Sequence, residues 1–196
     1  MTNVDGIVLA AGRSTRMGQS KAQLEATPGV TFLEHAVKAL RQGGCRYVIA
    51  VVNDEEDWTA RLADVSGAAV VINEMKRSQQ IDSIRLGIAQ LPNDCEGVLV
   101  LPVDFPGVQA ETVHALIEEF TRTRAPVIVP MHDSTPGHPV VFSRAVFGEL
   151  LAEPLARGAE TIVDAHAKDR VELKVNDPAV LTDIDSPEDY RRFKRE

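Results

Sequence analysis

The sequence has few cysteines, few aromatic side chains and no long hydrophobic run. Its 196 residues include two cysteines and one tryptophan, and Phe, Trp and Tyr together make up 5%. Cys45 and Cys95 are too few for a disulfide framework or a zinc site built from cysteines. No apolar stretch approaches the roughly 20 residues of a membrane span, and the first residues lack the basic and apolar regions of a signal peptide. We therefore expect a cytoplasmic protein without a membrane partner.

Positive charge is also scarce, because 21 Lys and Arg stand against 29 Asp and Glu, giving a net charge of −8. Proteins that bind nucleic acids present a basic surface, so nucleic acid is not an expected partner. Hydrophobic residues make up 44% and charged residues 26%, which is typical of globular proteins and excludes disordered and fibrous classes. A chain of this length is predicted to form a single domain over residues 1–196.

Short runs rich in Val and Ile recur along the chain and predict strands. They are continuously apolar rather than alternating, which is typical of strands that are buried on both faces. The runs are Gly6–Ala10, Tyr47–Val52, Ala69–Ile72, Val98–Leu101 and Val127–Val129.

Segments with helical spacing of apolar residues lie between these runs. The first begins at a capping box formed by Thr31 and Glu34 and ends at Gly43 and Gly44. Alternation of strands and helices predicts an α/β fold, a three-layer αβα Rossmann-like domain with a mostly parallel sheet. The other helices expected in this half are Glu55–Ala63, Ser83–Leu91 and Glu111–Thr123.

The pattern changes after Pro130. A further helix is expected to start with Ser186 at its N-cap and Pro187 in its first turn. The segment Met131–Gly137 is predicted to be the most mobile loop. The remaining expected elements are the strands Pro139–Phe142 and Val171–Val175 and the helices Arg144–Leu151 and Ala159–Ala167.

A basic loop with two glycines directly follows the first strand. Ligands of open α/β sheets bind outside the carboxyl ends of the strands, where this loop lies. Gly12 and Gly18 allow a phosphate to approach the backbone, and Arg13, Arg16 and Lys21 add positive charge. The spacing matches neither the P-loop nor the dinucleotide fingerprint GxGxxG. The loop therefore predicts a phosphate site of another kind, the alternative being a solvated loop that is merely basic.

Two acidic motifs are candidates for a metal site. Asp104 follows a buried strand, and Mg²⁺ prefers one or two carboxylates together with substrate phosphates. Asp183 and Asp185 flank Ile184, so their side chains point the same way if the segment is extended. The alternatives are a turn aspartate at Asp104 and, for the other pair, acids that only solvate a helix start.

The loop from Leu9 to Lys21 resembles the LAAGxSxRMGxxK signature of the MobA-like nucleotidyltransferases. Ala10 and Ala11 before Gly12 are similar to the molybdenum cofactor cytidylyltransferase branch, whereas the guanylyltransferase branch typically reads LAGG. The resemblance implies a Rossmann-like nucleotidyltransferase domain in which Arg16 and Lys21 hold a triphosphate. The residues that it implies for substrate binding in this loop are Leu9, Ala10, Ala11, Gly12, Arg13 and Gly18.

Three further motifs extend the resemblance. Asp104 matches the metal-binding aspartate of the family's PxDxP motif. Asp185, with Asp183 near it, matches the family's DIDTPED stretch. The resemblance implies that an aspartate of this stretch joins the metal shell. Gly137–Phe142 is similar to GHPVLF, in which His138 either faces the acceptor phosphate or caps the strand.

One segment departs from the family pattern. The cytidylyltransferase branch usually reads GMASSLRAG where this chain has Gln79–Gly87. Ser83, which the resemblance implies to contact base or ribose, is retained, but Gln79 replaces a glycine and Asp82 replaces a serine. The departure leaves the choice of nucleotide open.

The resemblance implies that a nucleoside triphosphate, CTP, reacts with a phosphorylated acceptor, molybdopterin, to release pyrophosphate with Mg²⁺ as cofactor. A phosphate acceptor is already largely ionised near pH 7 and needs no general base. One alternative is a guanylyl or other NTP transferase with a different acceptor. The other is a non-catalytic carrier that delivers the molybdenum cofactor to a client molybdoenzyme.

Overall fold

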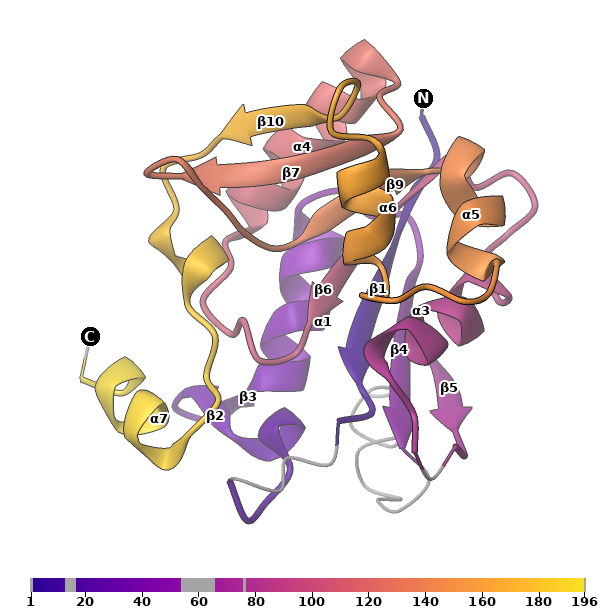
Figure 1. Ribbon diagram of the computed structural model, residues 1–196. Coiled ribbons are helices and arrows are strands. Elements are labelled where there is room, and N and C mark those ends of the chain that lie inside the picture. Colours follow the sequence, from indigo (N-terminus) through magenta and orange to yellow (C-terminus); the bar gives the residue numbers. More distant parts are fainter. Residues whose placement is uncertain (1, 13–16, 54–65, 76, 196) are drawn as a thin grey trace.

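A mixed β-sheet forms the centre of the computed structural model, which describes residues 2–12, 17–53, 66–75 and 77–195 (Figure 1). The strand order is β10-β7-β9-β6-β1-β4-β5. Neighbours in this order pair in parallel except at β9, which is antiparallel to both β6 and β7, and the short strand β8 (Thr135–Pro136) is antiparallel to β7 beside this order. The strands are β1 (Val4–Ala10), β4 (Val48–Asn53), β5 (Ala69–Asn73), β6 (Gly97–Pro102), β7 (Val127–His132), β9 (Val140–Ser143) and β10 (Val171–Lys174).

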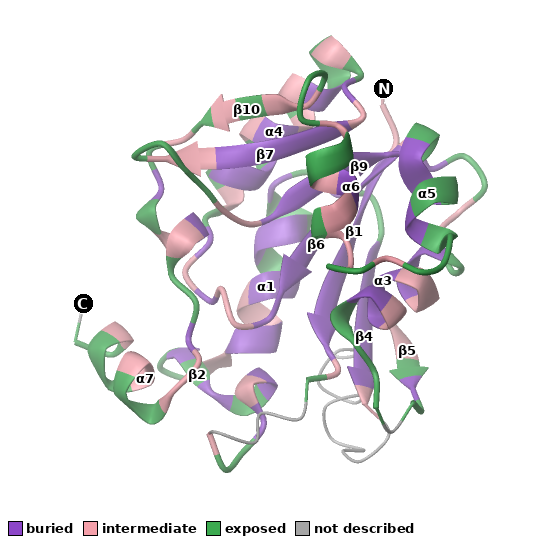
Figure 2. Ribbon diagram, viewed as in Figure 1, coloured by how far each residue is buried: buried purple, intermediate pink, exposed green. Residues whose placement is uncertain are grey.

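Helices cover both faces of this sheet. One face packs against α1 (Phe32–Gln42) and α4 (Ala110–Thr123). The other packs against α3 (Gln80–Ile88), α5 (Phe147–Leu151) and α6 (Glu160–Ala165). Strands β1 and β6 are buried along their whole length (Figure 2), as their continuous apolar runs predict. The expected three-layer α/β fold with a mostly parallel sheet is therefore confirmed.

Local signals set the starts of α1 and of the last helix where the sequence places them, whereas α3 runs over Gln80–Ile88 rather than the expected Ser83–Leu91. The Thr31 hydroxyl accepts a hydrogen bond from the Glu34 amide, and the Glu34 carboxylate accepts one from the Thr31 amide at 2.7 Å. Ser186 caps α7 (Pro187–Phe193) in the same way, with Asp189 as its reciprocal partner. None of the helices within the described ranges is long and apolar enough to cross a bilayer.

Several local expectations need correction. Met131–Gly137 forms a hairpin rather than an open loop, because β8 (Thr135–Pro136) pairs with the end of β7. Arg144–Leu151 starts as a 3₁₀ turn over Arg144–Val146 before α5 begins. The expected helix Glu55–Ala63 lies outside the described residues. The elements without a sequence prediction are the hairpin of β2 (Glu25–Thr27) and β3 (Val30–Thr31) and the 3₁₀ turns η1 (Lys21–Gln23) and η3 (Pro178–Leu181).

Candidate active site

A pocket of about 270 Å³ opens at the carboxyl ends of β1 and β6. The end of β1 contributes backbone and small side chains, and the end of β6 contributes Asp104. The first turn of α3 forms the opposite wall with Gln79, Gln80 and Ser83. The structure thus brings together many of the residues that the motifs single out. Those that line the pocket are Leu9, Ala10, Ala11, Gly12, Lys21, Ser83, Asp104 and Asp185.

Lys21 joins two carboxylates that are far apart in the sequence. Its Nζ lies 3.1 Å from Asp104 Oδ2 and 2.5 Å from Asp185 Oδ1. Burial lowers the pKa of Lys21, but the hydrogen bonds and negative charge of Asp185 and Asp104 outweigh burial and raise it above 10.5. Lys21 therefore stays protonated and provides a fixed positive charge.

The second carboxylate reaches the pocket because its neighbour is anchored in the core. Ile184 is 1% exposed, and its amide donates to the Asp104 carbonyl oxygen at 2.9 Å. This bond holds the segment after η3 against the end of β6. Asp185 consequently faces the pocket, whereas Asp183 is exposed and does not contribute to the pocket lining.

The chemistry of the two carboxylates suits a divalent cation. They converge on one positive charge, and carboxylate oxygens are the ligands that Mg²⁺ and Mn²⁺ prefer. Within the described ranges, no group of three or more His, Cys, Asp and Glu side chains is arranged to hold a metal. A cation at Asp104 and Asp185 would thus complete its shell with water and substrate phosphates, as Mg²⁺ commonly does.

Gly18 is the second glycine of the loop. Gly18 has a φ of +69°, a conformation that favours glycine, and it lies outside the pocket lining. Arg13 and Arg16, expected to hold phosphates, lie outside the described residues. Their roles stay predictions.

The substituted positions at the start of α3 form a local helix cap. The Gln79 amide donates to Asp82 Oδ2 at 2.8 Å, and Arg85 Nη1 lies 3.5 Å from the other carboxylate oxygen. Arg85 also donates to the carbonyl oxygens of Leu150 and Ala152, which tie α3 to the end of α5. Asp82 therefore fixes the start of the helix rather than pointing a charge at the pocket.

Sequence reasoning missed Asn73, which lies behind the α3 wall at the end of β5. It is 2% exposed, and its side chain bonds to both Ser78 and Ser83. A single asparagine at a strand end carries no motif. The only available signal is its position at the carboxyl end of a parallel strand, where ligand sites gather.

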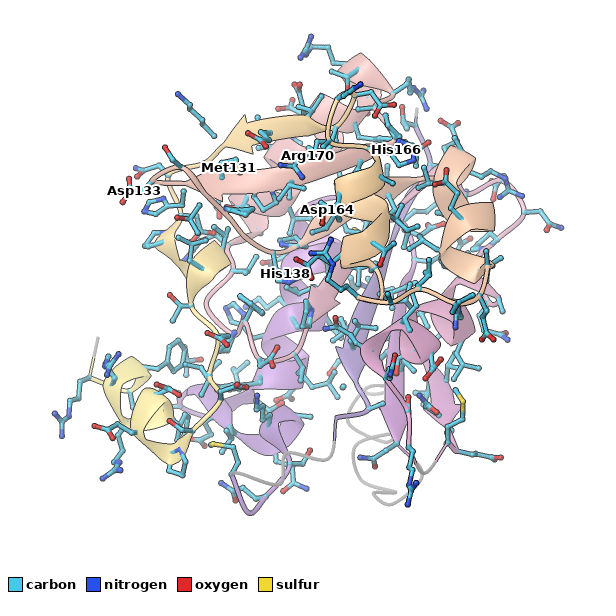
Figure 3. All side chains as sticks on the ribbon, viewed as in Figure 1. Met131, Asp133, His138, Asp164, His166 and Arg170 are labelled. Atoms are coloured by element: carbon cyan, nitrogen blue, oxygen red, sulfur yellow. The ribbon has the colours of Figure 1, made fainter. Side chains whose placement is uncertain are left out.

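A second pocket of about 670 Å³ adjoins the first and shares Gln79, Gln80 and Pro102 with it. Its walls include apolar side chains of α3 and β9 and charged side chains at α6. Asp164 of α6 pairs with Arg157 and lies 3.9 Å from Arg170. In Figure 3, Asp164 lies between Arg170 and His138. The pocket thus combines an apolar surface with both signs of charge.

His138 lines the second pocket rather than the first. Its ring lies 4.7 Å from the Phe105 ring, and its Nδ1 is buried without a hydrogen-bond partner in the described structure. Burial lowers the pKa of His138, although the charges of Asp104 and Asp183 oppose the shift. Burial therefore favours the neutral form of this imidazole at the wall of the second pocket.

Gly137 explains the first position of the GHPV motif. A Cβ on this residue would lie 2.3 Å from the Val180 carbonyl oxygen, closer than any side chain can approach. That same carbonyl oxygen accepts a hydrogen bond from the His138 amide at 2.9 Å. The close approach of the backbone at Gly137 to the backbone at Val180 sets the position of His138.

Two curated proteins show the range of relatives. The chain is 23% identical over 190 residues to the molybdenum cofactor cytidylyltransferase of Escherichia coli strain K12, covering 97% of this chain and 95% of that protein. It is 33% identical over 130 residues to the bifunctional protein GlmU of Mycobacterium avium strain 104. That match covers 63% of this chain but 26% of GlmU, so the chain spans about a quarter of that relative.

Solved structures match over the whole chain. Rv0371c from Mycobacterium tuberculosis H37Rv superposes with a TM-score of 0.84 at 29% identity, covering 100% of this chain and 98% of that one. Its complex with manganese gives a TM-score of 0.79 at 27% identity, covering 100% and 99%. The model of the MobA-like NTP transferase domain matches residues 6–171, which include the glycine loop, Lys21 and Asp104. The chain therefore belongs to the MobA-like NTP transferase family.

Proposed function

We propose that this nucleotidyltransferase transfers a cytidylyl group from CTP to the phosphate of a molybdopterin-like acceptor with Mg²⁺ as cofactor. The observation that carries the proposal is the meeting of Asp104 and Asp185 around one positive charge in the pocket beside the glycine loop. Two carboxylates at a phosphate-binding loop fit a metal–triphosphate complex. The cytidylyl choice rests on Ala10 and Ala11 and on the name of the E. coli relative.

The charged side chains of the pocket each have a role in the proposed reaction. Asp104 and Asp185 would hold the metal, which supplies positive charge to the phosphates when bound. Lys21 would hold the triphosphate, and the backbone at Gly12 would let it approach closely. Manganese in the M. tuberculosis structure supports a divalent cation at a site of this fold.

The reaction needs alignment more than proton transfer. An oxygen of the acceptor phosphate attacks the α-phosphorus, a new P–O bond forms, and the bond to pyrophosphate breaks. The acceptor is already ionised, so the main contributions are orientation and neutralisation of charge. Lys21 provides a permanent positive charge for the developing pyrophosphate, because its pKa is raised.

The second pocket is the proposed acceptor site. It shares a wall with the first pocket at Gln79, Gln80 and Pro102, so a molecule in it reaches the nucleotide directly. Its larger volume and apolar walls suit an organic acceptor with a ring system. His138 lines this pocket and lies close enough to Asp104 for the carboxylate charge to act on its ring, so we propose that it faces the acceptor phosphate.

The test is pyrophosphate release with CTP, UTP, GTP or ATP, each with molybdopterin, and with Mg²⁺, Mn²⁺ or EDTA. Asp104→Asn and Asp185→Asn should each abolish most metal-dependent turnover. Asp133→Asn is the matched control, since that carboxylate is exposed in the β7–β8 turn. Near-normal release by Asp104→Asn would overturn its role as a metal ligand, and molybdopterin binding without release would instead support a carrier.

Asp183→Asn separates the two acids of the C-terminal motif. We propose Asp185 as the principal ligand because it faces the pocket. If Asp183→Asn lost as much metal affinity as Asp185→Asn, both carboxylates would hold the metal.

A further inference from the structure

The side-chain amide of Asn73 has a fixed orientation. Its Oδ1 accepts a hydrogen bond from the Met75 amide at 3.0 Å, and a backbone N–H can only donate. The NH₂ group must therefore face the other way, toward Ser78 Oγ at 2.6 Å and Ser83 Oγ at 3.0 Å. All three polar groups of this buried amide are thus assigned without ambiguity.

The orientation of Asn73 determines what each serine can do. Both serine oxygens accept a hydrogen from Asn73, so each hydroxyl proton must point elsewhere. Ser78 donates its proton to the Gln79 carbonyl oxygen at 3.1 Å. Ser83 is 4% exposed and lines the first pocket, and its hydroxyl donates to no acceptor in the described part of the chain. A buried donor without an acceptor is costly, which indicates that a ligand supplies the acceptor.

The position of Ser83 identifies the part of the ligand that it meets. The charged groups of the pocket, Lys21, Asp104 and Asp185, belong to the phosphate side. The α3 wall presents Gln79, Gln80 and Ser83, which carry no charge. An uncharged wall that includes a hydroxyl donor of fixed direction suits a nucleobase better than a phosphate.

We propose that Asn73 is a specificity-determining positioning residue: it turns the Ser83 hydroxyl into an obligatory donor, so the site selects a base that presents an unprotonated oxygen or ring nitrogen there. A base with an N–H at that position meets a second donor and is rejected. The inference rests on the proposed function, since it concerns the base of the donor nucleotide. It assigns the selection to a residue that does not itself line the pocket.

A substitution that reverses the direction of the hydrogen bond between residue 73 and Ser83 tests the inference. In Asn73→Asp the oxygen that replaces the NH₂ group accepts the Ser83 proton, so the hydroxyl presents a lone pair to the pocket. Affinity for the triphosphate that the wild type prefers among CTP, UTP, GTP and ATP should fall about tenfold or more, the usual effect of an unpaired buried polar group. Ser83→Ala removes the donor itself and should give a similar loss. Calorimetry with Mg²⁺ present measures both variants.

Inorganic tripolyphosphate is the control ligand because it has the phosphates and lacks the base. Its affinity should be unchanged in Asn73→Asp and Ser83→Ala, which also shows that both variants are folded. The double variant should lose no more than the weaker-binding single variant, because Asn73 acts through Ser83.

Equal losses for tripolyphosphate and nucleotide, or additive losses in the double variant, would overturn the inference. Nucleotide binding that neither substitution alters would overturn it while leaving the proposed function intact. A wild-type protein that binds no nucleoside triphosphate would overturn both.

Discussion

The Lys21 ammonium lies 2.5 Å from the Asp185 carboxylate, in the space between the two acids that we propose as metal ligands. An ammonium and a divalent cation cannot share this space, because they repel each other and compete for the same oxygens. A metal bound there would therefore displace Lys21, and a triphosphate beside the metal would offer the ammonium a new partner. The same side chain would thus compete with the metal in the absence of nucleotide and assist its binding in the presence of nucleotide.

Replacement of Lys21 should raise metal affinity in the absence of phosphates and lower it in their presence. In Lys21→Met, Mn²⁺ affinity without nucleotide should rise about fivefold, since a competing charge worth about 1 kcal/mol is removed from a partly exposed site. With tripolyphosphate present, Mn²⁺ affinity should fall, because Lys21 no longer neutralises the phosphates. Titrations followed by electron paramagnetic resonance measure both, with Lys168→Met as the exposed control. A fall in Mn²⁺ affinity under both conditions would show that Lys21 does not compete with the metal for the carboxylates.

Gly137→Ala should destabilise the protein because its Cβ would lie 2.3 Å from the Val180 carbonyl oxygen. Forced overpacking of this kind costs about 1–3 kcal/mol of unfolding free energy, measured by urea denaturation. Gly148→Ala is the matched control, since nothing lies within 4 Å of its Cβ and it lies in helix α5. That control should gain up to about 1 kcal/mol from helix propensity. Equal stability of the two variants would show that the contact at Gly137 relaxes freely.

His166 should make stability depend on pH. Partial burial lowers the pKa of His166, but hydrogen bonds to Glu149 and Asp169 outweigh it and raise the pKa above 6.5. A histidine whose pKa is raised by folding stabilises the protein fully below the pKa that it has in the unfolded chain. This stabilisation is lost as pH rises through the pKa of the folded protein. The stability advantage of wild type over His166→Gln should therefore shrink with rising pH in urea denaturation between about pH 5 and pH 9. A constant difference across that range would show that the charge is not involved.

Ala11→Gly should raise the use of GTP relative to CTP. Both alanines line the pocket, but Ala11 packs against the core on the α3 side, whereas Ala10 is buried in the core on the α1 side. Removal of one methyl group changes discrimination by no more than about 1–3 kcal/mol, so the shift should be modest. Competition between the two nucleotides measures it, and Ala10→Gly should not reproduce it. A wild type that already prefers GTP would overturn the cytidylyl choice but not nucleotidyl transfer.

Elements with a periodic or capping signal could be predicted from the sequence, and elements set by turn geometry could not. The apolar runs and the Thr31–Glu34 box mark their strands and helix correctly. The β7–β8 hairpin depends on positive φ values at Asp133 and Ser134, which neither residue type demands. The β2–β3 turn did carry a signal, since Pro28 precedes Gly29, whose φ is +76°.

In the candidate site too, some residues could be predicted from sequence motifs and others could not. Lys21, Asp104 and Asp185 lie in recognisable motifs, and the structure brings them within hydrogen-bond distance. The motif favours Asp185 over Asp183 because Asp185 directly precedes Ser186 and Pro187, and the structure likewise places Asp185 in the pocket lining and leaves Asp183 exposed. Asn73 donates hydrogen bonds to Ser78 and Ser83, five and ten positions away, so no local pattern reveals this contact.

The dependence of the site on the Ile184–Asp185 segment has a consequence for biosynthesis. The sheet and the glycine loop all precede this segment in the chain, so a nascent chain lacks Asp185 until most of the protein has been translated. Such a chain would have Lys21 and Asp104 but not the second carboxylate that we propose as a metal ligand. With Asp185 in the proposed role, transferase activity would begin only after the segment beyond η3 had left the ribosome and docked beside β6.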